Sequence, residues 1–413
     1  MAETSQTLQD SFALWVAQAR AAKDDFIVLM IQRILQEASI RHASDVHFQP
    51  GRLGIDVRIR LDGVLHRVGI LPLSSAPQVA ARIKVLANLM TYKTTDPQEG
   101  RVRKGQIPFV DRDIRISTAP SLYGERIVAR FFSEGNKFLL PLELGFSNDI
   151  LRELSLAVQK TSGAILITGP AGNGKTTTAC ALLRALVNQE SPETNIVRSI
   201  ISLEDPIEHA IDGVAQMEVS RDGETTLDRL IRYLMRQDPD VIMVGEIRDR
   251  ATAEAALQAA LTGHLLISTF HASDAAGALC RLLELGIEPF TIRSSVSHIL
   301  CQRLVRHLCS CAVKQTSQKS IEILGETFRI NYWYEAKGCP NCHGTGYSGR
   351  FLVAESLPLG SDDMANAILE RRETSQLLRI GKENGMITLA ESAVKLIEEG
   401  KTSPIEILRV LGG

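Results

Sequence analysis

Residues 169–176 have the types and spacing that hold the phosphates of a nucleotide. They read Gly-Pro-Ala-Gly-Asn-Gly-Lys-Thr and fit the pattern G-x-x-x-x-G-K-[ST]. Glycines let backbone N–H groups turn toward phosphate oxygens, the lysine adds positive charge beside the β- and γ-phosphates, and the threonine hydroxyl is a ligand for Mg²⁺. The residues that we expect to bind the nucleotide are Gly169, Pro170, Ala171, Gly172, Asn173, Gly174, Lys175, Thr176 and Thr177, with Thr176 also on Mg²⁺.

Two acidic residues that follow apolar runs are candidates for catalysis. Glu204 ends the run Ile-Ile-Ser-Leu-Glu, and Glu246 follows Val-Ile-Met-Val-Gly. Hydrolysis needs one carboxylate to orient or deprotonate water and a second to manage the metal. In open parallel sheets the carboxyl ends of the strands face the ligand, so we expect both acids beside the phosphate loop. The alternative for each is a solvated loop carboxylate.

Two histidines, His264 and His271, stand at the two ends of another apolar run. Either is a candidate sensor of phosphate, and the alternative is a structural histidine with satisfied hydrogen bonds.

Four of the seven cysteines form two close pairs, Cys309 with Cys311 and Cys339 with Cys342. Four thiolates hold a structural Zn²⁺ tetrahedrally, and the spacing of the second pair is typical of a zinc knuckle. The alternative is reduced, metal-free cysteines in a small packed module. We expect Cys180, Cys280 and Cys301, which follow helical apolar patterns, to be buried in the core.

The elements around these residues fall into two kinds. Short, fully apolar runs alternate with amphipathic helical patterns beyond residue 149, which predicts an α/β domain with a parallel sheet covered on both faces. Before it, apolar and polar residues alternate over 55–61, and an Asp-Gly pair at 62–63 predicts a hairpin turn. This alternation places Arg58 and Arg60 on one polar face, where a solvated sheet edge is the alternative to a binding role.

Composition narrows the class of protein. The chain has 413 residues, a formal net charge of −2 and 5% aromatic residues. The length predicts two or three domains, and the charge excludes a strongly basic protein that coats nucleic acid. The N-terminal residues lack the pattern of a secretory signal, and no apolar run approaches the roughly 20 residues that cross a bilayer. We therefore expect a cytoplasmic protein that reaches the membrane only through partners.

Several segments resemble one family. Residues 203–208, 236–249 and 262–271 look like the Asp box, Walker B motif and His box of the secretion ATPase superfamily, in particular the type II secretion and type IV pilus assembly ATPases. Four further segments, at 43–47, 58–63, 97–101 and 123–126, resemble the second N-terminal domain of that family. The resemblance covers about residues 26–413.

The resemblance implies an α/β fold. A RecA-like P-loop motor domain with a parallel sheet would follow a PAS-like α+β domain and precede a small cysteine-rich module and helices. The expected parts are an N-terminal extension (1–25), an α+β domain (26–135), a linker (136–148), an ATPase domain (149–300), a tetracysteine module (301–357) and a helical segment (358–413).

The resemblance also implies activity and partners. We expect a hexameric motor that hydrolyses ATP with Mg²⁺ and moves an inner-membrane platform protein, without nucleic acid. Glu204 would activate water and Glu246 would be the Walker B acid, with the division between them open. His264 or His271 would report the γ-phosphate, and Arg58 and Arg60 would neutralise phosphate charge.

Three departures and three alternatives accompany this expectation. The first cysteine pair is C-x-C where the assembly branch of the family has C-x-x-C, and only about 25 residues precede the matched region, where larger members carry a docking domain. Asn173 and Ala171 replace more usual loop residues, with little effect expected. The alternatives are a pilus-retraction ATPase, a nucleotide-gated scaffold and a nucleic-acid translocase. The resemblance implies that retraction-type pilus ATPases lack the cysteine cluster.

Overall fold

The computed structural model describes residues 8–20, 25–132, 140–188, 197–219 and 226–412. The described residues belong to two compact units. The first, which we call the N-terminal unit, comprises residues up to 135 together with 308–313 and 336–349. The C-terminal unit comprises 136–307, 314–335 and 350–413. The first residues of the expected linker (136–148), up to 139, lie outside the described residues. Among the described residues, no helix has the length and apolar character needed to span a membrane.

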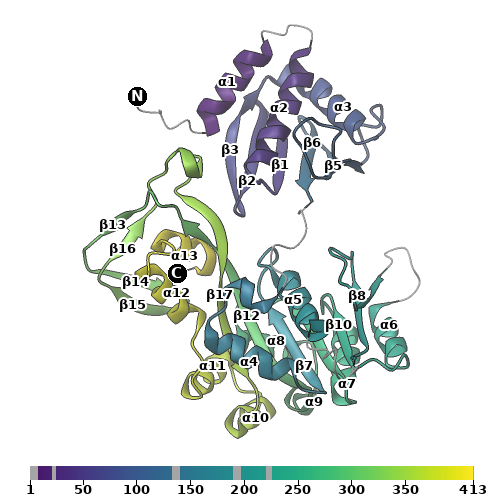
Figure 1. Ribbon diagram of the computed structural model, residues 1–413, viewed down its shortest axis with the longest axis vertical. Helices are drawn as coiled ribbons and strands as arrows, with labels where there is room; N and C mark the ends of the chain where they lie inside the picture. The colour runs from purple at the N-terminus through teal and green to yellow at the C-terminus, as the bar shows by residue number, and fades with distance from the viewer. Residues whose placement is uncertain (1–7, 21–24, 133–139, 189–196, 220–225, 413) are drawn as a thin grey trace. The chain divides into compact units, whose positions relative to one another are not determined.

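The N-terminal unit contains an antiparallel six-stranded sheet in the order β3-β2-β1-β6-β5-β4 (Figure 1). Its strands are β1 (Asp45–Gly51), β2 (Gly54–Leu61), β3 (Val64–Leu71), β4 (Gln98–Val102), β5 (Ile114–Ser121) and β6 (Gly124–Phe131), and its helices are α1 (Leu8–Arg20), α2 (Phe26–Ile40) and α3 (Ala76–Leu86). The predicted hairpin is confirmed, because Leu61 pairs with Val64 across Asp62-Gly63. Helix α2 buries one apolar face, which includes Met30, Ile34 and Ala38.

The C-terminal unit is built on a seven-stranded sheet in the order β17-β12-β7-β11-β10-β8-β9. Its strands are β7 (Gly163–Thr168), β8 (Ile200–Glu204), β9 (Ala215–Glu218), β10 (Val241–Val244), β11 (Leu265–Phe270), β12 (Val296–Leu308) and β17 (Tyr347–Pro358). The pairings of β12, β7, β11, β10, β8 and β9 are parallel. Every residue of β7, β8, β10 and β11 is buried, which confirms the predicted parallel sheet.

Helices cover both faces of this sheet. They are α4 (Asn148–Val158), α5 (Lys175–Asn188), α6 (Leu227–Leu234), α7 (Arg250–Leu261), α8 (Ala275–Glu284) and α9 (Pro289–Ser295). Side chains of β7 alternate between two cores, since Leu166 packs with α7 and α8 while Ile165 and Ile167 pack with α4 and α5. Helix α7 meets its core through small side chains, because Ala253, Ala256 and Ala259 have no exposed surface.

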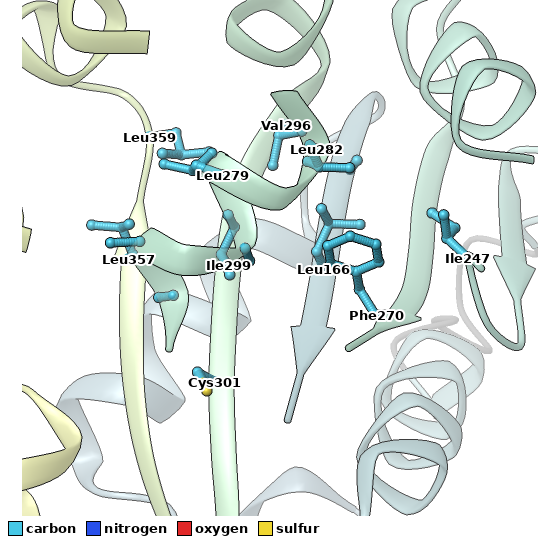
Figure 2. Close-up of a cluster of buried hydrophobic side chains, with 14 of the residues drawn as sticks. Leu166, Ile247, Phe270, Leu279, Leu282, Val296, Ile299, Cys301, Leu357 and Leu359 are labelled. Atoms are coloured by element: carbon cyan, nitrogen blue, oxygen red, sulfur yellow. The ribbon is translucent and has the colours of Figure 1, made fainter. Parts of the chain in front are cut away.

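The sheet extends beyond the expected ATPase domain boundary at residue 300, which falls inside β12. Figure 2 shows Ile299 and Cys301 of β12 in one apolar cluster with Leu357 of β17. Cys301 is buried as expected, but on a strand, so the helical pattern assigned to it was wrong. Cys180 is buried on α5, whereas Cys280 on α8 is partly exposed.

Beyond β12 the chain forms short strands and four helices. The strands are β13 (Val313–Gln315), β14 (Lys319–Ile323), β15 (Glu326–Ile330) and β16 (Trp333–Glu335), paired as β13–β16 and β14–β15. The helices are α10 (Asp362–Leu369), α11 (Thr374–Glu383), α12 (Leu389–Glu398) and α13 (Pro404–Leu411), and single 3₁₀ turns lie at Leu73–Ser75, Pro141–Leu144 and Pro340–Cys342.

A buried ion pair attaches helix α13 to strand β12. The Glu406 carboxylate is fully buried and accepts hydrogen bonds from Arg306 Nε (3.0 Å) and Nη2 (2.7 Å), while Arg409 approaches it from the more exposed side. Burial alone would raise the pKa of Glu406, but the hydrogen bonds from Arg409 and Arg306 lower it below its ordinary value. The carboxylate is therefore ionised at neutral pH and holds two guanidinium groups.

Glu406→Ala would leave Arg306 buried without its counter-charge. We expect the free energy of unfolding of the C-terminal unit to fall by about 3–5 kcal/mol, measured by urea denaturation. The matched control is Arg409→Ala, which removes a partner whose side chain is 42% exposed and should cost about 1 kcal/mol or less. Equal losses for the two variants would contradict the structural role given to the buried pair.

Candidate functional site

The phosphate-loop motif occupies the turn between β7 and α5. Strand β7 ends at Thr168 and helix α5 begins at Lys175, so the glycines lie between a buried strand and a helix N-terminus. Gly169, Gly172 and Gly174 have φ values of 140°, 75° and 76°, which L side chains rarely adopt. This is the geometry in which loop N–H groups and the helix dipole face one anion.

The lysine of the loop is largely buried. Its Nζ donates to the carbonyl oxygens of Gly169 at 2.7 Å and Pro170 at 3.0 Å, and lies 3.5 Å from His271 Nδ1. Burial lowers the pKa of Lys175, while the nearby Glu246 carboxylate raises it, with a net shift below the ordinary value. A phosphate group at this point would replace neutral carbonyl partners with charged ones.

Glu204 is the last residue of strand β8, and its two carboxylate oxygens differ in their hydrogen bonds. Its Oε1 accepts hydrogen bonds from Ser202 Oγ at 2.7 Å and Gln216 Nε2 at 2.9 Å. The side chain is buried, yet Oε2 has no hydrogen-bond partner among the described residues. A buried carboxylate oxygen without a partner is costly in the folded protein, and it is well placed to accept a proton or bind water.

Glu246 follows strand β10 and contacts His271, which follows the neighbouring strand β11. Glu246 Oε1 is in direct contact with His271 Nε2, and Arg248 Nε donates to the other carboxylate oxygen. His271 Nδ1 lies 3.2 Å from the Gly169 carbonyl oxygen. The histidine therefore joins the acid of one strand to the phosphate loop of another.

These groups line one cavity of about 850 Å³. Its wall includes Lys175, Thr176, Glu204, Glu246 and His271, together with Ala171 and Gly172 of the loop. The parallel sheet therefore brings its carboxyl ends together at this cavity, as expected. Thr176 offers a hydroxyl and Glu246 a carboxylate, which are oxygen ligands of the kind that Mg²⁺ prefers.

His264 lies at the opposite end of β11 from His271. It precedes Leu265, the first residue of the strand, and its Nδ1 lies 2.9 Å from the Ala259 carbonyl oxygen at the end of helix α7. His264 is absent from the cavity wall, so of the two histidines only His271 is placed to meet a phosphate.

Arg58 and Arg60 lie on β2 of the N-terminal unit, on its polar face as the alternation predicts. Arg58 forms an ion pair with Asp56 at 2.7 Å, and Arg60 lies 3.3 Å from Asp45. These carboxylates orient both guanidinium groups. A phosphate-binding role for the pair stays a prediction.

The four cysteine sulfurs of Cys309, Cys311, Cys339 and Cys342 lie within 4.8 Å of one another. The Sγ–Sγ distances are 3.7 Å for 309–339, 3.9 Å for 311–342 and 3.7 Å for 339–342. Four sulfurs about 2.3 Å from a central tetrahedral Zn²⁺ lie about 3.8 Å apart. Backbone N–H groups of Cys339 and Gly346 donate to Cys342 Sγ at 3.1 and 3.2 Å, which stabilises a thiolate. The cluster can hold a metal ion despite the shorter first pair.

Sequence reasoning missed the side chains that support the acids and the loop. Ser202 stands two residues before Glu204 on the same strand, so the period of a β-strand could have indicated it. Gln216 and Gln302 have no such signal, because each contacts its partner from another strand, 12 residues from Glu204 and 129 residues from Asn173 respectively. The Gln302 carbonyl oxygen packs directly against Gly169.

A strand–loop–helix phosphate cradle, with two acids and a histidine at the edge of the same parallel sheet, defines a P-loop nucleotide-binding protein. The chain belongs to the family described as type II/IV secretion system protein, whose model matches residues 20–409.

Similar proteins agree with this membership. The chain is 38% identical to type II secretion system protein E of Pseudomonas aeruginosa, over 93% of this chain and 75% of that protein. It is 36% identical to the type IV pilus assembly ATPase PilB of Thermus thermophilus, over 92% of this chain, but spans only 42% of that relative's length. The protein is accordingly a P-loop ATPase.

Solved structures support the fold. The ATPase DotB of Legionella pneumophila matches with a TM-score of 0.65 at 20% identity, over 92% of this chain and 94% of that one. The pilus retraction motor PilT, in a structure with bound ADP, matches with a TM-score of 0.59 at 23% identity, over 92% and 96%. At these identities the likeness concerns the fold alone.

Gly169→Ala would place a Cβ 2.5 Å from the Gln302 carbonyl oxygen. We expect a free energy of unfolding lower by about 1–3 kcal/mol than that of Gly172→Ala, measured by thermal denaturation. Gly172 is the matched control because its φ is also positive while nothing lies within 4 Å of a Cβ built there. Equal destabilisation of the two variants would contradict the close packing of β12 against the loop.

Proposed function

We propose that the protein is a motor ATPase that hydrolyses ATP to drive type IV pilus assembly or type II secretion, as a homo-hexamer acting on an inner-membrane platform protein. The observation that carries the proposal is the meeting of Lys175, Glu204, Glu246 and His271 at one cavity. The relatives named above are pilus assembly and secretion proteins, which supports this setting.

In this mechanism the residues of the loop bind the phosphates of ATP. Backbone N–H groups of residues 169–176 and the start of α5 meet the phosphate oxygens, and Lys175 turns from its carbonyl partners to the β- and γ-phosphates. Thr176 and Glu246 would hold Mg²⁺, which neutralises phosphate charge when bound.

Glu204 activates the attacking water. Ser202 and Gln216 hold its Oε1, which leaves Oε2 as the oxygen that would accept a proton from the water. Glu246 holds His271 through the contact between Oε1 and Nε2, and a γ-phosphate beside Gly169 would compete for the same imidazole. His271 thereby reports whether the γ-phosphate is present. The proposal also gives Arg58 and Arg60 the role of neutralising phosphate charge.

Catalysis is tested by three substitutions measured for ATP turnover and ATP affinity. Lys175→Ala should abolish turnover. Glu204→Gln should lower kcat by about 10²–10⁴-fold because the water loses its base. Glu246→Gln should retain ATP binding and lose hydrolysis.

The control for these variants is Glu254→Gln, which neutralises a carboxylate on the outer side of α7 and should leave turnover unchanged. Turnover retained by Lys175→Ala would refute the site. Strong stimulation of the wild-type rate by DNA would favour a nucleic-acid translocase over a pilus or secretion motor.

The cysteine cluster would hold a structural Zn²⁺ through Cys309, Cys311, Cys339 and Cys342. The distances among the sulfurs and the N–H groups that face Cys342 support a tetrathiolate ion. A zinc ion bound there would cross-link the segment that carries Cys309 and Cys311 to the segment that carries Cys339 and Cys342, and it would have no redox activity.

Metal analysis of the purified protein should find about one zinc per chain. Cys339→Ser should lower this content and the thermal midpoint, whereas Cys280→Ser, the matched change at a cysteine outside the cluster, should keep the zinc. Metal-free protein with an unchanged midpoint in Cys339→Ser would support the reduced, packed cluster instead.

A further inference from the structure

Strand β12 is longer than its neighbour β7 and continues alongside the phosphate loop. The pairing of the two strands ends where Cys301 meets Thr168, the last residue of β7. The next residues of β12, Gln302 to Leu304, therefore have a loop beside them in place of a strand. A Cβ on Gly169 would lie 2.5 Å from the Gln302 carbonyl oxygen, so the loop and this part of β12 are in direct contact.

The Gln302 side chain joins the loop to helix α5. It has no exposed surface, and its Nε2 donates to the Asn173 carbonyl oxygen at 2.7 Å. Its Oε1 accepts a hydrogen bond from Thr178 Oγ1, in the first turn of α5, at 2.9 Å. One buried amide thus fixes the distance between the loop and the helix that together form the phosphate cradle.

The Asn173 side chain attaches the loop to β12 a second time. Its Oδ1 accepts a hydrogen bond from the Leu304 backbone N–H at 2.8 Å, and its Nδ2 lies 3.3 Å from the Pro170 carbonyl oxygen. An alanine at 173 would leave the Leu304 N–H without this acceptor. Little effect was expected of Asn173 in the loop, but nothing in the sequence indicated that its side chain has a partner on β12.

We infer that Asn173 and Gln302 are positioning residues for the nucleotide, which hold the loop in its phosphate-binding shape before the nucleotide arrives. The inference rests on the proposed function, because it assigns the pair to the binding of ATP. Asn173 immediately precedes Gly174 and Lys175, so its attachments fix the N–H groups and the lysine that meet the phosphates. If these attachments are removed, the nucleotide must order the loop as it binds, and this ordering lowers the net binding free energy.

The test uses Asn173→Ala and Gln302→Met in the full chain, with Mg²⁺-ADP as the binding probe in calorimetry and ATP as the substrate. Each variant should raise the Kd for ADP and the KM for ATP by about tenfold, the equivalent of one net hydrogen bond. Saturating ATP orders the loop in both forms, so kcat should change by about twofold or less. The double variant should lose less binding free energy for ADP than the sum of the losses of the two single variants.

Ser297→Ala is the matched control. Ser297 Oγ donates to the Ala164 carbonyl oxygen at 3.1 Å, so the change removes one side-chain bond between β12 and β7 at the end away from the loop. Its Kd and KM should equal those of the wild type, even where its thermal midpoint falls.

Two results would overturn the inference, and they are distinguishable. Wild type that binds ADP, with Asn173→Ala binding equally well, refutes the positioning role and leaves the proposed function intact. Wild type that binds neither ADP nor ATP refutes the proposed function and the inference together. Because Asn173 is half-buried, Asn173→Ala gives the readout even where Gln302→Met fails to fold.

Discussion

Complete burial of four parallel strands between two helical layers is the constraint from which the site follows. Such strands have no solvent-exposed face for charged side chains, so the charged groups gather where the strands end. Thr168, Glu204 and Phe270 are the last residues of β7, β8 and β11, and loops begin directly after them. The phosphate loop, both acids and His271 share one cavity because the sheet gives them one edge on which to lie.

Three buried glutamates of the C-terminal unit differ in how their carboxylate oxygens are hydrogen-bonded. Glu406 is satisfied by arginines, and Glu355 accepts the backbone N–H groups of Ala275 and Leu389 at the starts of α8 and α12. Burial raises the pKa of Glu355, yet each of its oxygens has a partner. Glu204 differs because one of its oxygens has none among the described residues, and this oxygen belongs to the side chain that lines the cavity.

The sequence predicted those features that depend on local pattern. Apolar runs indicated β7, β8, β10 and β11, and the glycine spacing indicated the loop between β7 and α5. The role of β12 was beyond such reasoning, because a buried run with Cys301 at its centre fits a helix and a strand equally well. The attachment of Asn173 to the Leu304 N–H was also hidden, since a backbone partner 131 residues away leaves no mark on side-chain types. His264 and His271 stand at opposite ends of one predicted strand, and the direction of β11 places only His271 at the edge that bears the cavity.

The small side chains of helix α7 set a limit on how this protein can change over evolutionary time. Ala253, Ala256 and Ala259 have no exposed surface, so each added methylene must push the helix outward. The first turn of the same helix carries Thr252, which lines the cavity and is bonded to Asp249. Larger side chains on the buried face of α7 would therefore displace the cavity wall. Substitutions without this effect are expected at solvent-exposed positions of the helix, such as Glu254.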